Sequence, residues 1–225
     1  MDINLLIELA IKEDIREGDI TSNCIIPEDA IAKAQIIFKQ SAILCGIDIA
    51  KQVLQRFDAT IKFKKFFEDG AMINEGEIVA VIEGKTKAII GSERILLNFL
   101  QHLSAIATTA NIYAEKVRKY NVKILDTRKT IPVFRELEKY AVLCGGCQNH
   151  RHGLFDMVLI KDNHISAAGS LEKAIKLVIN NLEFIKLQKA KAMKIEVEVE
   201  TLQQLNEFLE KKLDSILKRA KDNGI

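Results

Sequence analysis

Positively charged side chains follow two apolar segments that have the pattern of buried strands. Thr127, Arg128 and Lys129 follow the first segment after one aspartate, Asp126, and Lys161 directly follows the second. In parallel α/β folds the functional residues gather where strands end and helices begin. These cations therefore predict a site for a carboxylate or a phosphate. For each cation taken alone, a solvated loop is the alternative interpretation.

Acidic side chains alternate with branched apolar residues over residues 195–200, and the acidic positions are Glu196, Glu198 and Glu200. Successive side chains of a strand point to opposite faces, so the three carboxylates share one face. Inside a barrel such charges are costly unless cations, a metal or a polyhydroxyl ligand compensate them. A half-exposed strand with its polar face in water is the equally weighted alternative.

A Cys-x-x-Cys pair, Cys144 and Cys147, precedes His150 and His152. Zinc binding or redox chemistry is one interpretation of this spacing. No second ligand pair with zinc-ribbon spacing follows in the sequence, so we expect no metal-ligating residues here. The two glycines between the cysteines instead predict backbone N–H groups that approach an anion, and Arg151 would add a bidentate contact.

Together these residues predict one site with many cations and a few carboxylates. Its members are Arg128, Lys129, His150, Arg151, Lys161 and the glutamates of residues 196–200. Neither a Ser–His–Asp order nor a Cys–His nucleophile pair stands out. The set favours a highly anionic substrate, a second group that bears hydroxyls or magnesium, and a transfer reaction driven by charge stabilisation and positioning.

The elements that must position these residues fall into two parts. In the first, apolar spacing predicts helices over 3–11 and 47–57 and strands over 34–38, 61–66 and 77–82, with a turn at 13–22. Ser92 is predicted to cap a long helix that extends to about residue 120. We expect residues 1–120 to form an α+β domain that includes this connecting helix.

After residue 120 short apolar strands alternate with helices, which is typical of a parallel sheet or barrel. The predicted strands are 122–125, 157–160, 194–200 and 214–217, and the predicted helices are 134–144, 171–182 and 202–211. A complete barrel of this type takes about 250 residues. We therefore expect residues 121–225 to form an incomplete α/β barrel domain.

Composition narrows the function further. The 225 residues are 48% hydrophobic and 28% charged, and 33 basic against 31 acidic residues give a net charge of +2. This balance argues against nucleic acid as the main partner. The N-terminal residues lack the pattern of a signal peptide, and no apolar stretch approaches the roughly 18 residues of a membrane helix. We expect a cytoplasmic protein that does not bind membranes.

Several short motifs occur in a fixed order over roughly residues 1–217. They are Gly18-Asp19-Ile20-Thr21, Glu93-Arg94, Asp126-Thr127-Arg128-Lys129-Thr130, Glu138-Lys139-Tyr140, Asn149-His150-Arg151, Leu159-Ile160-Lys161-Asp162-Asn163-His164 and Glu196-Val197-Glu198-Val199-Glu200. Any one of them is weak evidence, but the ordered set is specific. On these motifs the sequence resembles the quinolinate phosphoribosyltransferase family, also called nicotinate-nucleotide pyrophosphorylase (carboxylating).

The resemblance implies an N-terminal α+β sandwich domain followed by an open α/β barrel, here only its first half. It implies transfer of phosphoribosyl from phosphoribosyl pyrophosphate to the ring nitrogen of quinolinate. Pyrophosphate and CO₂ leave, and nicotinate mononucleotide for NAD biosynthesis results. Mg²⁺ accompanies the pyrophosphate. The family forms homodimers or higher homo-oligomers whose subunits share active sites.

The resemblance also implies roles for individual residues. Arg128, His150 and Arg151 would bind quinolinate, and Thr127 belongs to the same substrate-binding set. Lys129 and Lys161 would contact quinolinate or phosphate, and Glu198 would face the ribose hydroxyls or magnesium. Lys129, Lys161 and Glu198 are the candidate catalytic residues. Arg94 would reach the site of the partner subunit.

The sequence departs from the family pattern after Leu217, where a basic run replaces the expected strand end. A truncation or frameshift there is our interpretation. Two alternatives to the enzyme stay open: an inactive or unstable remnant that at most binds quinolinate, and a molybdenum-transport-associated relative on the same scaffold. The intact Thr127-Arg128-Lys129 and Asn149-His150-Arg151 motifs favour quinolinate over the second alternative.

Overall fold

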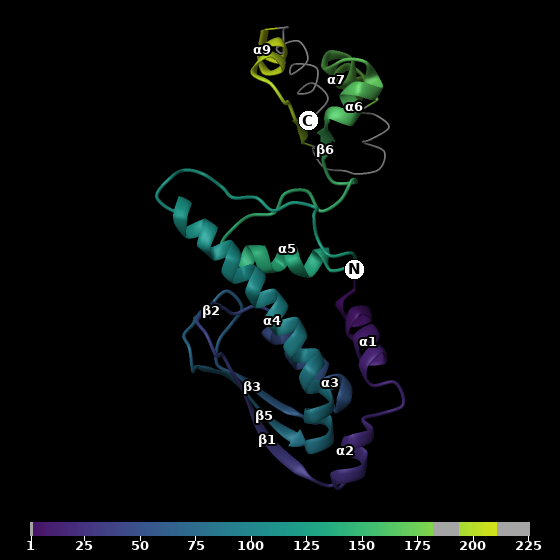
Figure 1. Cartoon of the computed structure of the whole chain (residues 1–225), viewed down its shortest axis with the longest axis vertical. Helices are drawn as coiled ribbons and strands as arrows, with labels where there is room; N and C mark the ends of the chain where they lie inside the picture. The colour runs from purple at the N-terminus through teal and green to yellow at the C-terminus, as the bar shows by residue number, and fades with distance from the viewer. Residues whose placement is uncertain (1, 182–193, 211–225) are drawn as a thin grey trace. The chain divides into compact units, whose positions relative to one another are not determined.

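The computed structural model describes residues 2–181 and 194–210. The chain divides into two compact units, the first ending at His150 and the second beginning at Arg151 (Figure 1). The predicted strand at 214–217 and the predicted helix ends at residues 182 and 211 lie outside the described residues. Within the described residues, no helix combines the length and the apolar character that crossing a bilayer requires.

Two short helices open the first unit, α1 (Ile3–Asp14) and α2 (Ile20–Ile25). The expected turn over 13–22 is therefore wrong in its second half. Asp19 is the reason, because its side chain accepts a hydrogen bond from the backbone N–H of Ser22 at 3.0 Å and so caps α2.

The first unit also contains an antiparallel sheet with strand order β1-β5-β3. Its strands are β1 (Ile31–Ile37), β3 (Lys62–Lys65) and β5 (Ile78–Lys85), which agree with the three predicted strands. A second antiparallel pair joins β2 (Ala42–Ile43) and β4 (Met72–Ile73). Helix α3 (Ile47–Phe57) begins and ends at the predicted residues.

Helix α4 (Thr86–Val117) runs the length of the first unit and packs against α3, β2 and α5 (Figure 1). Its apolar face supplies a large share of the core, including Leu96, Phe99 and Leu103. The predicted helix cap at Ser92 is wrong. Ser92 is fully buried inside α4, where its hydroxyl donates to the Ile89 carbonyl at 3.0 Å.

Helix α5 (Arg135–Cys144) packs on α4 and completes the first unit. The predicted strand at 122–125 is reduced to a single parallel bridge between Leu125 and Gln148. The predicted domain boundary after residue 120 stays a prediction. The compact unit extends to residue 150 because α5 contributes Leu137, Ala141 and Cys144 to the core formed around α4.

The second unit contains a parallel strand pair with helices. Its elements are β6 (Val158–Ile160), α6 (Asp162–Ala168), α7 (Leu171–Asn180), β7 (Ile195–Val197) and α9 (Leu202–Glu210). β6 pairs with β7 in parallel, with Leu159 opposite Glu196. Ile160, Ala174 and Ile175 are buried in a small core. This parallel pair agrees with the parallel arrangement predicted for the strands after residue 120.

Candidate functional site

Two of the sequence motifs lie side by side in the first unit. Residues 124–126 and 148–150 run in parallel: Gln148 N–H donates to the Ile124 carbonyl at 2.9 Å, and Asp126 N–H donates to the Gln148 carbonyl at 3.0 Å. The segment that leads into Thr127-Arg128-Lys129 is thereby fixed beside the segment that leads into His150. The carboxyl ends of parallel segments meet at one edge, and both predicted cation motifs continue from this pair.

A buried ion pair locks this arrangement. Lys139 on α5 is 1% exposed, and its ammonium contacts the carboxylate of Asp126, which is 8% exposed. The same carboxylate accepts the His150 N–H at 2.8 Å, and the ammonium also donates to the His150 carbonyl at 3.1 Å. Asn149 completes the network, because its amide nitrogen, assigned from the hydrogen-bonding pattern, donates to Asp126 at 2.8 Å. Every charge is paired, as burial requires.

The loop that carries Arg128 and Lys129 is held at several points. Lys129 N–H donates to the Thr127 hydroxyl at 3.0 Å, and Ile131 N–H donates to Glu138 on α5 at 3.3 Å. Glu138 in turn lies 3.0 Å from His102 Nε2 on α4.

The end of this loop is strained and anchored. Phe134 stacks on Phe99 with ring centroids 5.8 Å apart. Val133 just before it has φ = 63°, a conformation that is rare for a branched residue. Such strain persists only where the surroundings fix the backbone, and it clusters at functional sites.

Arg128 holds an unused donor. Its Nε is buried without a hydrogen-bond partner among the described residues. Thr127 and Lys129 beside it are exposed. A buried polar atom without a partner is uncommon in folded proteins and calls for an explanation. An anionic ligand that accepts from the guanidinium would provide one.

The interpretation of Gly145 and Gly146 as an anion-binding turn is wrong. Both N–H groups are used to end α5, Gly145 donating to the Ala141 carbonyl at 3.1 Å and Gly146 to the Leu143 carbonyl at 2.9 Å. Gly145 is required by packing, since a Cβ there would lie 2.3 Å from the Ala107 carbonyl oxygen. Gly146 has φ = 88°, which favours glycine.

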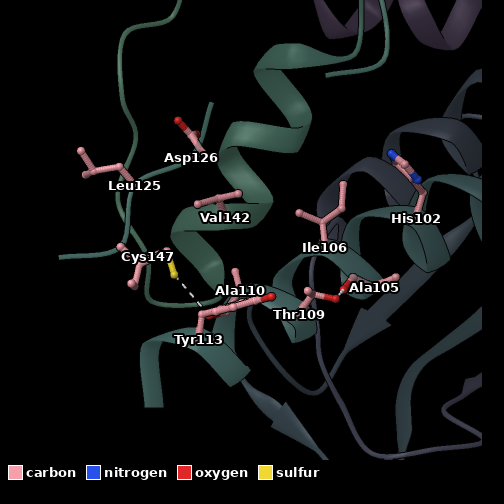
Figure 2. A pocket seen from close by; sticks show the side chains of 11 residues that line it. His102, Ala105, Ile106, Thr109, Ala110, Tyr113, Leu125, Asp126, Val142 and Cys147 are labelled. Carbon is pink, nitrogen blue, oxygen red and sulfur yellow. Dashed lines mark hydrogen bonds between the residues drawn. The ribbon is translucent and has the colours of Figure 1, made fainter. Parts of the chain in front are cut away.

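A largely apolar groove of about 480 Å³ borders the Asp126 network (Figure 2). It lies between α4, α5 and residues 124–126, with Ile106, Val142 and Cys147 in its lining. The buried Cys147 thiol donates to the Ala110 carbonyl at 3.2 Å beside this groove. None of Arg128, Lys129 and His150 lines it, so it is separate from the predicted anion site.

The second unit brings together two more of the predicted residues. Lys161 directly follows β6, and Glu198 directly follows β7. Their side chains form an ion pair, in which Lys161 Nζ lies 3.0 Å from Glu198 Oε2. The backbone N–H of Glu198 donates to the Ile160 carbonyl at 2.9 Å, which fixes the two strand ends in register. Glu196, Glu198 and Glu200 are all exposed, as in the alternative of a half-exposed strand with its polar face in water.

Arg151 begins the second unit and is buried, with 8% of its surface exposed. Its guanidinium donates to the Met157 carbonyl at 3.3 Å, while its Nε has no partner among the described residues. The loop after it is ordered by Asp156, which accepts from the His152 and Gly153 N–H groups at 2.7 and 2.9 Å. Burial raises the pKa of Asp156, but the backbone N–H groups of His152, Gly153 and Asp156 together with the charge of His152 outweigh it and hold that pKa below its usual value.

Arg94 lies elsewhere in the first unit. It is exposed on α4 and lines a groove of about 730 Å³ together with Phe38, Gln101 and Thr108. Thr127, Arg128 and His150 do not line this groove. The structure therefore groups Thr127, Arg128, Lys129 and His150 in the first unit and Lys161 with Glu198 in the second.

Sequence reasoning missed the roles of Asp126 and Lys139. Both residues belong to the ordered motifs of the sequence, but only the cations after Asp126 were predicted to have a function. A signal was present, because an aspartate that directly follows a buried apolar run must find a partner.

Two family models match consecutive parts of this chain. Residues 19–104 match the model "Quinolinate phosphoribosyl transferase, N-terminal domain", and residues 106–219 match "Quinolinate phosphoribosyl transferase, C-terminal domain". The two matches together cover most of the chain and follow one another in the family's domain order.

Curated relatives agree with these matches. Quinolinate phosphoribosyltransferase [decarboxylating] 1b of Nicotiana tabacum is 41% identical over 210 residues, 93% of this chain and 58% of the relative. A probable nicotinate-nucleotide pyrophosphorylase [carboxylating] of Bacillus subtilis is 40% identical over 91% of this chain and 68% of the relative. The chain thus spans somewhat more than half the length of the plant relatives.

Solved structures show the same likeness. NadC from Streptococcus pyogenes superposes with a TM-score of 0.85 at 33% identity, over 97% of this chain and 80% of that one. The nicotinate-nucleotide pyrophosphorylase from Francisella tularensis gives 0.83 at 39% identity, over 93% and 71%. With two strand-end motifs fixed by a buried ion pair, two matching domain models and these relatives, the chain belongs to the quinolinate phosphoribosyl transferase family and has its two-domain architecture.

Proposed function

We propose that this chain transfers phosphoribosyl from phosphoribosyl pyrophosphate to quinolinate and releases CO₂ and pyrophosphate. The observation that carries the proposal is the parallel pairing of residues 124–126 with 148–150, fixed by Asp126 and Lys139. We infer that this pairing brings Arg128 and Lys129 near His150, because both motifs continue from the paired segments. Relatives that are 40–41% identical are named for this reaction.

The chemistry of quinolinate suits these cations. Quinolinate carries two carboxylates, so at least two positively charged groups must hold it. Arg128 supports this role best, since its buried Nε has no partner among the described residues and a planar guanidinium can bind a carboxylate through two hydrogen bonds. His150 and Arg151 are the proposed further quinolinate contacts, and Thr127 and Lys129 extend the same edge.

The reaction depends more on the positioning of its two reactants than on acid–base groups. The ring nitrogen of quinolinate supplies its own electron pair to C1 of the ribose, and pyrophosphate leaves with the bonding electrons. The nitrogen is then positive, which stabilises the carbanion formed when the 2-carboxylate departs as CO₂, and that carbon takes up a proton. Such a site works by orienting reactants and stabilising charge.

Lys161 and Glu198 are the proposed residues for the phosphoribosyl group. They end two neighbouring parallel strands and are only half-buried or exposed, so a ligand can reach both. An ammonium suits a phosphate oxygen, and a carboxylate suits ribose hydroxyls. We assign Lys129, Lys161 and Glu198 as the catalytic set, with the ion pair between Lys161 and Glu198 opening when the substrate enters.

We propose that Mg²⁺ arrives with the pyrophosphate group. The exposed carboxylates of Glu196, Glu198 and Glu200 offer the oxygen donors that Mg²⁺ prefers, so the residues present fit this ion. Magnesium would neutralise the leaving pyrophosphate. The protein's own contribution would be to hold the carboxylate face in place through the pairing of β6 with β7.

The finer architecture is part of the same proposal. The first unit's sheet and helices correspond to an α+β sandwich domain, and the parallel β6–β7 pair corresponds to the first half of an open α/β barrel. We propose a homo-oligomer in which the exposed Arg94 reaches the active site of a partner subunit. Cytoplasm remains our proposed compartment, although named plant relatives include chloroplastic and mitochondrial proteins.

Turnover tests the proposal directly. Purified chain is incubated with phosphoribosyl pyrophosphate, Mg²⁺ and quinolinate labelled in the 2-carboxylate, and both labelled CO₂ and nicotinate mononucleotide are measured. We expect equal amounts of the two products, their loss when EDTA removes Mg²⁺, and none when nicotinate replaces quinolinate. Quinolinate binding without any product would show the binding remnant instead, and product from nicotinate would contradict the assignment of a dicarboxylate substrate.

A further inference from the structure

Three potential metal ligands from separate segments meet in the first unit, outside the proposed substrate site. Cys45 lies between β2 and α3, Asp69 lies in the turn between β3 and β4, and Cys144 is the last residue of α5. The two sulfur atoms and a carboxylate oxygen all lie within 4.8 Å of one another. Cys45 is buried and the other two are half-buried, so the group extends from the core to the surface.

Hydrogen bonds fix the orientation of these ligands. One oxygen of Asp69 accepts from the N–H groups of Gly46 and Ile47 at 2.9 and 3.0 Å. The backbone N–H of Cys45 donates to the Ser104 hydroxyl on α4 at 3.0 Å. Partners of this kind, one step behind the ligands, are a regular feature of metal sites because they orient the donor atoms.

The second oxygen of Asp69 and the two sulfurs remain as the inward-facing donors. The Tyr140 hydroxyl donates to this oxygen at 2.9 Å. The sulfurs of Cys45 and Cys144 lie within hydrogen-bonding reach of each other. Both thiols would release their protons on binding a metal, because the thiolate is the form that ligates it.

Two thiolates and one carboxylate are a ligand set for zinc. Soft sulfur ligands select zinc over magnesium or calcium, and zinc also takes carboxylate oxygens. Zn–S bonds of about 2.3 Å and Zn–O bonds of about 2.0 Å place tetrahedral ligand atoms roughly 3.5 Å apart. The three donor atoms, which lie within 4.8 Å of one another, would move closer together to reach this geometry on binding.

We propose that Cys45, Asp69 and Cys144 bind one Zn²⁺ ion. Water or the Tyr140 hydroxyl takes the fourth position. The site differs from the Cys-x-x-Cys interpretation of the sequence, because Cys147 bonds to the Ala110 carbonyl and does not join the group. Only folding brings Cys45 and Asp69 to Cys144, so spacing in the sequence gives no sign of this set.

A zinc ion here would act as a structural cross-link. It would join the end of α5 to the β2–α3 connection and to the β3–β4 turn. Helix α5 also carries Lys139, which forms the buried ion pair with Asp126 next to the predicted cations Arg128 and Lys129. Zinc would therefore stabilise helix α5, and with it the position of Lys139. This inference is independent of the proposed transferase activity.

Zinc content tests the inference. The full chain is purified under reducing conditions, loaded with zinc, dialysed and measured by elemental mass spectrometry. We expect about one zinc per chain and a higher thermal midpoint with zinc than after chelation. Cys144→Ser and Cys45→Ser lose the metal, Asp69→Asn weakens its retention, and Cys147→Ser is the matched control that keeps it.

Cobalt gives a second readout of ligand identity. Co²⁺ bound by thiolates shows sulfur-to-cobalt charge-transfer absorption, which we expect in the wild type and in Cys147→Ser and expect to be lost in Cys144→Ser. Reduced wild-type protein that retains no zinc overturns the proposal. So does a Cys144→Ser variant with full zinc content, or loss of zinc in Cys147→Ser alone. Asp69→Asn covers the case in which a cysteine variant does not fold.

Discussion

At the scale of single residues, local patterns predicted the alternation of the glutamates but not the pair that supports the site. Strand alternation depends only on neighbours in the chain, so the shared face of Glu196, Glu198 and Glu200 could be predicted, while its exposure was one of two equally weighted alternatives. Lys139 sits in a helix among charged residues, where lysine is usually exposed. Its partner Asp126 is 13 residues away, and only the folded chain brings the two together.

Replacement of Lys139 tests this pair. Lys139→Met leaves the Asp126 charge buried without its counter-ion, so we expect the free energy of unfolding to fall by about 3–5 kcal/mol. Urea denaturation followed by circular dichroism measures the change. Lys62→Met is the control, because Lys62 forms an exposed ion pair with Glu83 and should cost at most about 1 kcal/mol. Equal effects of the two variants would contradict the structural role of the buried pair.

At the scale of elements, helices with a strong apolar stripe were predicted well. α3 and α5 agree with their predicted ranges within a residue, since each has a clear amphipathic period. Ser92 was wrongly assigned as a cap because a serine before an apolar stripe also occurs inside a helix, where it can bond back to a carbonyl. The two glycines after Cys144 were misread because the packing of α5 on α4 is a tertiary contact.

Gly145 tests that packing. A Cβ at Gly145 would lie 2.3 Å from the Ala107 carbonyl oxygen and 2.6 Å from the Ala110 side chain. We expect Gly145→Ala to cost about 1–3 kcal/mol through overpacking, which corresponds to a drop in thermal midpoint of roughly 2–12 °C for a chain of this size. Differential scanning calorimetry measures it.

The control for this variant is Gly91→Ala. Gly91 lies inside α4, and a Cβ there would lie 3.3 Å from the Phe57 ring, which can shift. Replacing a glycine with alanine inside a helix raises the free energy of unfolding by about 0.5–1 kcal/mol. This gain offsets the tight contact with Phe57, so the net change in the free energy of unfolding should be small. A Gly145→Ala protein as stable as Gly91→Ala would mean that α5 does not approach α4 as closely as described.

At the scale of the whole molecule, the order of the motifs was more informative about the family than any predicted helix or strand. The ordered motifs predicted the family, which the domain models and relatives confirm. The compact units were less predictable, because residues 121–150 look like the start of an α/β domain and yet pack with the first unit through α5. Burial of apolar side chains, which depends on partners far away in the sequence, decides that assignment.

Quinolinate binding to an Arg128 variant is the measurement that tests the central claim most directly. Isothermal titration calorimetry would compare the wild type, Arg128→Ala and Lys123→Ala, an exposed cation on the same segment. A charge-assisted hydrogen bond is worth about 1.5–3 kcal/mol, so Arg128→Ala should weaken binding roughly 10- to 150-fold. Lys123→Ala should leave binding within about twofold of the wild type. Unchanged affinity in Arg128→Ala, with the fold intact by circular dichroism, would contradict the claim that the edge formed by residues 124–130 and 148–150 holds quinolinate.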